Sequence, residues 1–100
     1  MFSSFDADTG ICEIGGWLIP EAEGHGLITR AFRHMIGWAI ELRGMNRVEL
    51  RASPENTRAG TIAQRLRMTH EATLRSAFTV NGTHHASEVW AILATEWPKR

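Results

Sequence analysis

The sequence contains no tyrosine and a single cysteine, Cys12, in 100 residues. One cysteine cannot form an internal disulfide bond, so we expect a chain suited to the reducing cytoplasm. No apolar run approaches the roughly 20 residues that span a bilayer, and the N-terminus lacks the basic start and apolar core of a signal peptide. The formal net charge is zero without a clustered basic segment, which argues against a nucleic-acid partner. A composition of 43% hydrophobic and 22% charged residues instead predicts one small folded domain with a limited core.

Hydrophobic periodicity predicts an α/β (α+β) domain with a mixed sheet and two helices. Residues 1–10 end in a turn rich in Asp and Gly, which favours a hairpin into the next strand. A strand-helix-strand unit follows, and its two strands should be parallel with a right-handed connection. Asn81-Gly82 predicts a tight hairpin turn between two later strands. In chain order, the expected elements are strand Ile11–Leu18, helix Leu27–Leu42, strand Arg47–Ala52, helix Thr57–Arg67, and strands Glu71–Val80 and His84–Leu93.

The loop between the first long strand and the first helix is the strongest candidate site. Residues 13–30 read EIGGWLIPEAEGHGLITR, with Gly24 and Gly26 just before the helix. A helix N-terminus leaves backbone N–H groups unpaired and carries the positive end of the helix dipole. Glycine lets that backbone approach a phosphate closely. The loop is therefore a candidate phosphate cradle, although a plain turn is an alternative interpretation of the same spacing.

Several motifs in one order resemble the GNAT acetyltransferase superfamily, and within it the branch typified by ribosomal-protein-alanine N-acetyltransferases. That branch writes the loop region as E-I-G-x-W-L-x-P followed by [RQ]-x-x-G-x-G and a helix opening near a Thr. The chain matches these motifs at Glu13–Pro20, at Glu21–Gly26 apart from its first residue, and at Thr29, and resembles the branch again at Asn46–Glu49, Pro54–Asn56, Val80–Gly82 and Glu96–Trp97.

The resemblance implies acetyl-CoA as the acyl donor and assigns a role to each part of the loop. Backbone amides from Glu23 to Ile28 would cradle the pyrophosphate, and the splayed strand near Trp17 would hold the pantetheine arm and supply an oxyanion donor. Asn56 aligns with an asparagine that contacts the cofactor, although a helix cap is an alternative or additional role. The implied cofactor-binding residues are Trp17, Leu18, Ile19, Glu23, Gly24, His25, Gly26, Leu27, Ile28, Thr29 and Asn56.

The chain also departs from the family pattern. Glu21 stands where the branch has Arg or Gln, and Ala59 replaces a serine that can act as the general acid. Arg67-Met68 replaces Gly-Phe at the end of the second helix. The catalytic residues therefore stay unassigned, and Cys12 is not needed as a nucleophile because the amine attacks the thioester directly. No metal site is expected, because adjacent His84 and His85 should point to opposite faces of a strand.

The resemblance covers only the C-terminal half of a GNAT domain. Residues 1–10 would be a remnant of the third strand and its turn, and residues 11–97 the acetyl-CoA-binding half of a single truncated domain spanning 1–100. A half-sheet should bare an edge and an apolar face, so we expect a protein partner or a homodimer to cover the missing half.

Three functions remain open at this point. The first is an acetyl-CoA-dependent N-acetyltransferase acting on a protein N-terminal amine or a small-molecule amine. The second is a truncated, non-catalytic regulatory or accessory protein that binds acyl-CoA or only a partner protein. The third is a structural interaction domain that binds no cofactor.

Overall fold

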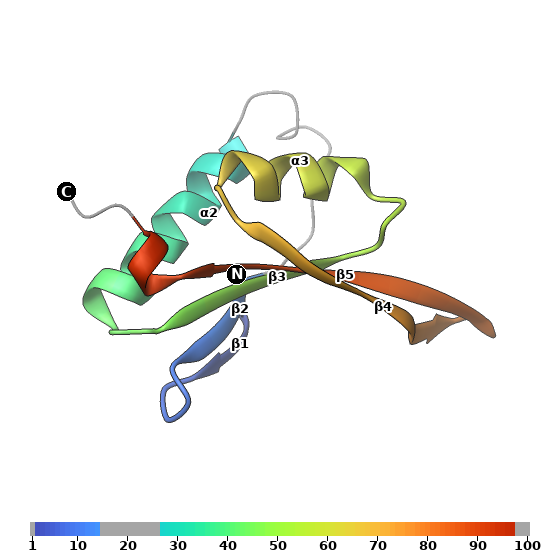
Figure 1. Cartoon of the computed structure of the whole chain (residues 1–100), viewed down its shortest axis with the longest axis horizontal. Helices are drawn as coiled ribbons and strands as arrows, with labels where there is room; N and C mark the ends of the chain where they lie inside the picture. Colours follow the sequence, from blue (N-terminus) through green and yellow to red (C-terminus); the bar gives the residue numbers. More distant parts are fainter. Residues whose placement is uncertain (1, 15–26, 98–100) are drawn as a thin grey trace.

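The computed structural model describes residues 2–14 and 27–97 (Figure 1). Five strands form one mixed sheet in the order β1-β2-β3-β5-β4. Strands β2 and β3 are parallel, and every other neighbouring pair is antiparallel. This confirms the predicted α+β class. The elements are β1 (Phe2–Asp6), β2 (Ile11–Ile14), α2 (Leu27–Gly37), a π-helical turn η1 (Trp38–Leu42), β3 (Arg47–Ala52), α3 (Thr57–Arg65), β4 (Thr69–Val80), β5 (Thr83–Leu93) and η2 (Ala94–Glu96).

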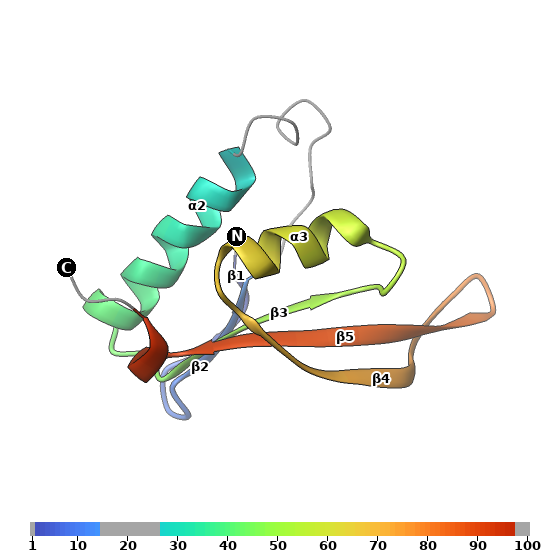
Figure 2. The same cartoon turned by 45° about the horizontal axis from the view of Figure 1, so that its top comes forward.

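Both helices cover the same face of the sheet (Figures 1 and 2). Alternate residues of the strands point toward them, because side chains along a strand alternate between the two faces. In β3, for example, Val48 is 0% exposed and Leu50 is 5% exposed, while Glu49 between them faces away from the helices. The core between helices and sheet consists of Cys12, Ile14, Phe32, Ile36, Ala39, Met45, Val48, Leu50, Ala63, Leu66, Met68, Trp90 and Ile92.

The opposite face of β2 and β3 carries a set of charged side chains, beside the exposed apolar Ile11 on β2. Glu49 lies between Arg47 and Arg51 along β3, at 2.8 Å and 3.6 Å from their side-chain nitrogens. Arg51 also lies 3.7 Å from Glu13 on β2, and Arg47 donates two hydrogen bonds to Glu71 on β4. Charges that pair with one another let this part of the face meet water, whereas the predicted protein partner or homodimer stays a prediction.

The first predicted helix has the expected limits but not a uniform structure. After Gly37 the chain continues as the π-helical turn, closed by a hydrogen bond from the Arg43 N–H to the Trp38 carbonyl at 3.2 Å. The wider turn shifts the side chains out of the α-helical pattern. Leu42, the last residue of the predicted helix, is therefore 74% exposed, while Ile40 packs against the core. Gly44 ends the segment with φ +65°, as expected of a glycine that follows a helix.

The second helix ends two residues earlier than predicted, in a Schellman motif. The N–H groups of Arg67 and Met68 donate to the carbonyls of Gln64 and Ala63, each at 3.0 Å. Arg67 takes φ +62° at the left-handed position that glycine usually fills. The departure from Gly at this position therefore places a strained residue in the fold.

Replacing Arg67 by glycine should stabilise the domain by about 1 kcal/mol, because glycine reaches the left-handed conformation without a Cβ clash. Chemical denaturation of the Arg67→Gly variant should show a higher midpoint with an unchanged slope. An equal or lower midpoint would contradict the strain assigned to this residue.

Strands β4 and β5 form a long arm that extends beyond the helices (Figures 1 and 2). Each begins slightly earlier than predicted, at Thr69 and Thr83. The Asn81-Gly82 turn is confirmed, with φ +49° and +77° at its two residues, as a type I′ turn requires. Two register shifts in β4 interrupt the pairing of this edge strand with β5. Such irregularities hinder further edge-to-edge pairing, and the arm carries exposed Leu74, Phe78 and Val80.

Candidate functional site

The parallel pair β2 and β3 defines the candidate site. Their described pairing runs from Ile11 opposite Arg47 to Ile14 opposite Leu50, so their carboxyl ends lie on the same edge of the sheet. Each strand is followed by a helix, α2 or α3, and neither helix has an acidic residue in its first turn. In open α/β sheets ligands bind beyond the carboxyl ends of parallel strands, where helix N-termini attract anions. This edge can therefore receive a phosphate-bearing ligand.

The structure places four of the predicted cofactor-binding residues. Leu27 begins α2, Ile28 is partly buried, and Thr29 is 7% exposed. Asn56 stands directly before α3. The predicted contacts of these residues with acetyl-CoA stay predictions. The other seven, Trp17, Leu18, Ile19, Glu23, Gly24, His25 and Gly26, lie outside the described residues.

Asn56 caps the N-terminus of α3, which was one of its two predicted roles. Its side-chain oxygen accepts a hydrogen bond from the Ala59 N–H at 3.1 Å. The side-chain amide of asparagine also has two N–H donors, so the cap leaves Asn56 able to donate to a cofactor. Ala59 is buried at 8% exposure and brings no hydroxyl to this end of the helix. The position of the serine of related sequences thus contributes packing only.

Glu49 is a candidate functional residue that the sequence analysis did not identify. Its carboxylate faces away from the helices, one residue before the last described β2–β3 pair, and its side chain is only 15% exposed. The signal available in the sequence was the alternation Arg47-x-Glu49-x-Arg51, which puts one carboxylate between two guanidinium groups on one face of a strand. On the same face, hydrogen bonds from Arg47 hold the pKa of the Glu71 carboxyl below its ordinary value.

Cys12 is fully buried in the core, on the helix side of β2. Burial, with a smaller effect from the charge of Glu49, raises the pKa of its thiol from 9.0 to about 11. A thiol that keeps its proton is a poor nucleophile. The chemistry of this residue agrees with a mechanism in which the amine attacks the thioester without a cysteine intermediate.

In the folded protein at pH 8, Cys12 should react with a thiol reagent about 100-fold more slowly than free cysteine. The native state also holds this proton more tightly than the unfolded chain does. Stability should therefore fall as the pH rises from about 9 to 11, and this part of the pH dependence should vanish in Cys12→Ala. Rapid labelling of the native protein, with normal labelling in denaturant as the reference, would contradict the assignment.

Across residues 2–14 and 27–97, no group of three His, Cys, Asp or Glu side chains is arranged to hold a metal ion. Within the same part of the chain, no helix has both the length and the apolar character needed to cross a membrane.

Comparison with known proteins identifies the family. The sequence model described as "Acetyltransferase (GNAT) domain" matches residues 1–69. The chain is 36% identical over 85 residues to a Bacillus subtilis (strain 168) protein named "Putative ribosomal N-acetyltransferase YdaF", a match that covers 85% of this chain and 46% of that protein. The chain belongs to the GNAT acetyltransferase family.

Solved structures confirm the fold. A crystal structure titled "Probable acetyltransferase" superposes with a TM-score of 0.89 at 33% identity, covering 96% of this chain and 54% of that chain. The ribosomal-protein-S5-alanine acetyltransferase of Vibrio fischeri superposes with a TM-score of 0.85, over 98% of this chain and 54% of that one; at 17% identity it supports the fold alone. The chain thus spans about half the length of these relatives.

Proposed function

We propose that the chain binds acetyl-CoA beyond the carboxyl ends of β2 and β3 and transfers its acetyl group to a protein N-terminal amine or a small-molecule amine. The single observation that carries this proposal is the parallel β2–α2–β3 unit in a chain of GNAT sequence. In the sequence, Gly24 and Gly26 lie between β2 and α2. The similarity to a protein named as a ribosomal N-acetyltransferase favours a protein amine as the acceptor.

In the proposed arrangement, the diphosphate of acetyl-CoA lies at the N-terminus of α2, and the backbone of Gly24 and Gly26 donates to it. The thioester arm follows β2, where main-chain N–H groups near Trp17 and Leu18 stabilise the oxyanion that forms during amine attack. A first turn without acidic residues in α2 supports this assignment, because no fixed negative charge there opposes the diphosphate.

We assign the role of proton acceptor for the attacking amine to Glu49. Its carboxylate is mostly buried beside the parallel strand pair, and it lies on the face of the sheet opposite the helices. An acceptor amine that approaches from that face would meet a carboxylate positioned by Arg47 and Arg51. General-base catalysis of this kind typically contributes a factor of 100 to 10,000 in rate.

The Glu49→Gln substitution should lower kcat about 100-fold while leaving the affinity for acetyl-CoA unchanged. Glutamine keeps the shape of the side chain but cannot accept the proton. Steady-state acetylation assays over a pH series, with calorimetry for acetyl-CoA, would separate the two quantities. Asp8→Asn is the matched control, since it removes an exposed carboxylate from the turn between β1 and β2, outside the ion pairs of Arg47 and Arg51. An unchanged kcat in Glu49→Gln would remove this residue from the mechanism.

A non-catalytic protein that retains acyl-CoA binding is the second candidate, and Ala59 together with the absence of tyrosine favours it. Calorimetry and turnover distinguish the two functions. Acetyl-CoA binding with consumption of the thioester in the presence of an amine supports the enzyme, whereas binding without turnover supports the regulatory or accessory protein.

We further propose that residues 11–97 form the acetyl-CoA-binding half of the domain, with 1–10 as the remnant of a preceding strand and turn. We also propose that the protein acts in the cytoplasm.

A protein partner or a second copy of the chain is proposed to pair with strand β1. This strand has one described sheet neighbour, β2, so its other side is available. Size measurement in solution, alone and with candidate partners, would test this proposal.

A further inference from the structure

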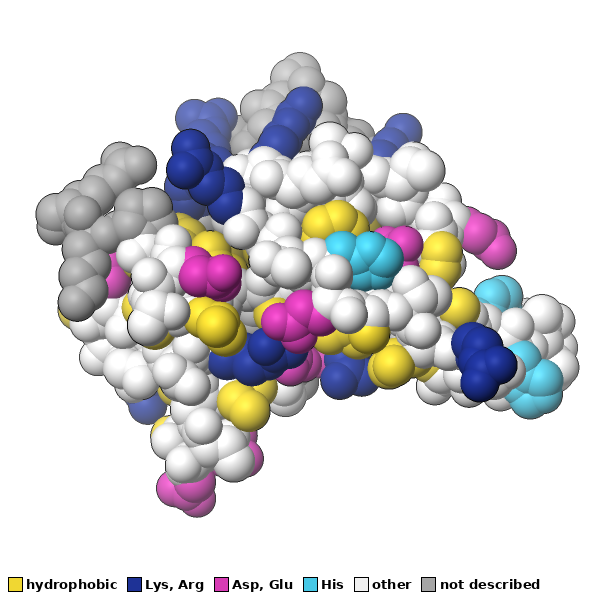
Figure 3. Space-filling view, viewed as in Figure 1, with side chains coloured by type: hydrophobic (Ala, Val, Ile, Leu, Met, Phe, Trp, Pro, Cys, Tyr) yellow, Lys and Arg dark blue, Asp and Glu magenta, His cyan; other side chains and the backbone are white. Residues whose placement is uncertain are grey.

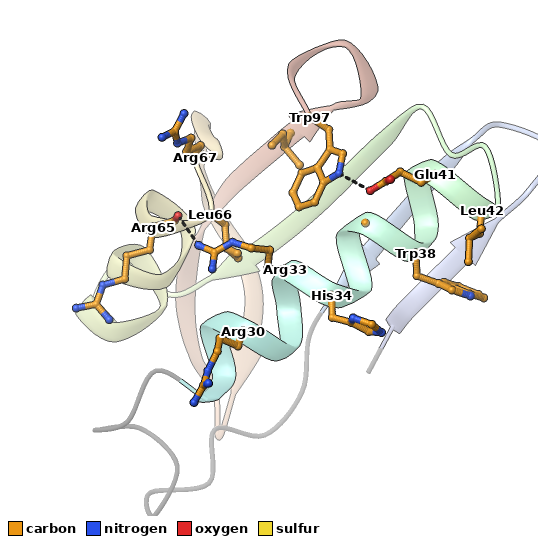
Figure 4. Close-up of a pocket in the computed structure, with 12 residues that line it drawn as sticks. Arg30, Arg33, His34, Trp38, Glu41, Leu42, Arg65, Leu66, Arg67 and Trp97 are labelled. Atoms are coloured by element: carbon orange, nitrogen blue, oxygen red, sulfur yellow. Dashed lines mark hydrogen bonds between the residues drawn. The ribbon is translucent and has the colours of Figure 1, made fainter. Parts of the chain in front are cut away.

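A groove on the helix face lies between α2 with its π-helical turn, the C-terminal end of α3, and η2 (Figure 4). Its volume is about 1090 Å³, and it lies away from the Asn56 end of α3. We call it the basic groove. It is lined by Arg30, Arg33, His34, Gly37, Trp38, Glu41, Leu42, Arg65, Leu66, Arg67, Ile92 and Trp97.

The rim of the basic groove carries positive charge that the described part of the chain does not neutralise. Four arginines surround it, and none of them forms an ion pair with a carboxylate of residues 2–14 or 27–97. Its single carboxylate, Glu41, accepts a hydrogen bond from Trp97 Nε1 at 2.9 Å. Figure 3 shows Arg side chains gathered over the helices. A chain with zero formal net charge thus gathers four arginines on one surface, without an ion pair to any carboxylate of the described residues.

The floor of the groove is apolar and held in place. Leu66 and Ile92 are 3% and 1% exposed, and Trp97 lies against Gly37, where an added Cβ would come within 3.4 Å of the indole ring. Arg33 is tied to the rim by a hydrogen bond from Nη2 to the Arg65 carbonyl at 3.3 Å. The groove therefore combines a fixed apolar floor with cationic edges.

We propose that the basic groove binds an acidic, amphipathic polypeptide segment. Carboxylates of such a segment would pair with the guanidinium groups at the rim, which suit carboxylate geometry, while its apolar side chains cover the floor. The proposal does not depend on acetyl transfer.

A nucleic acid fits the groove less well than an acidic peptide. Bases bound without sequence preference need free aromatic faces to stack on. Trp38 already packs against the rings of Phe2 and Phe5, at centroid distances of 5.7 Å and 5.8 Å, and Arg43 lies over it. Trp97 is fixed by Glu41 and Gly37. An acidic segment needs only the cations and the apolar floor.

The test uses fluorescence anisotropy with a labelled 12-residue peptide of repeating Glu-Leu-Glu, compared with Lys-Leu-Lys and with a 12-nucleotide oligouridylate. Arg67→Gly is the decisive variant, because it removes one rim cation while relieving backbone strain and so cannot act by unfolding the domain. Arg75→Gln is the matched control, since it removes one exposed arginine from the β4–β5 arm.

The acidic peptide should bind, with affinity that falls as salt rises. Its affinity should drop about two- to fivefold in Arg67→Gly and stay unchanged in Arg75→Gln. The proposal is overturned if the acidic peptide does not bind, if both variants weaken it equally, or if the oligouridylate or the basic peptide binds more tightly.

Discussion

The Gly26→Glu substitution is expected to weaken acetyl-CoA binding by about 100-fold, or about 2.7 kcal/mol. Gly26 directly precedes the first residue of α2, where the proposed diphosphate contacts are backbone N–H groups and the positive helix end. A glutamate would place a Cβ and a negative charge next to two phosphates. Titration calorimetry with acetyl-CoA would measure the loss directly.

Thr83→Glu provides the matched control for that experiment. It adds the same charge at an exposed position on the β4–β5 arm, which extends beyond the helices (Figure 1). Its affinity for acetyl-CoA should stay within a factor of two of the parent chain, because exposed charges at a distance are largely screened. If both variants bound acetyl-CoA as the parent does, the glycine loop would have no part in holding the diphosphate.

The Ile36→Ala substitution should lower the free energy of unfolding by about 3 kcal/mol, within the 2–5 kcal/mol found for such core truncations. Ile36 is 0% exposed and joins α2 to the sheet core. In a domain of this size, each kcal/mol shifts the melting temperature by about 4–8 °C, so a fall of roughly 12–24 °C is expected. Thermal and denaturant unfolding monitored by circular dichroism would measure it.

Leu42→Ala is the informative comparison. Leu42 lies six residues after Ile36 in the same predicted helix, but it belongs to the π-helical turn and is 74% exposed. Its removal should therefore change stability by less than about 0.5 kcal/mol. Comparable losses at positions 36 and 42 would mean that α2 continues as a regular α-helix.

The order and type of the elements followed from the sequence because their signals are local. Alternation in Arg47–Ala52 predicted β3 with its observed limits, and Asn81-Gly82 predicted the hairpin turn. The cap at Asn56 was foreseen for the same reason, since it needs only a side chain three residues before a backbone N–H.

A local departure from regular helix geometry and the contacts between distant segments were not predictable in this way. At Leu42, the hydrogen bond from the Arg43 N–H to the Trp38 carbonyl widens the turn, and the Leu42 side chain is exposed. The ion pairs of Arg47 join β3 to β4 across 24 residues, so the charged sheet face became visible only in the folded chain. The basic groove likewise forms from residues of α2, η1, the end of α3 and β5, together with Trp97 after η2.

A crystal of the protein grown with acetyl-CoA tests the central claim most directly. We predict electron density for the diphosphate at the N-terminus of α2, with the pantetheine arm running between β2 and β3 toward Glu49. Density for the coenzyme in another place, or none at saturating acetyl-CoA, would contradict the account.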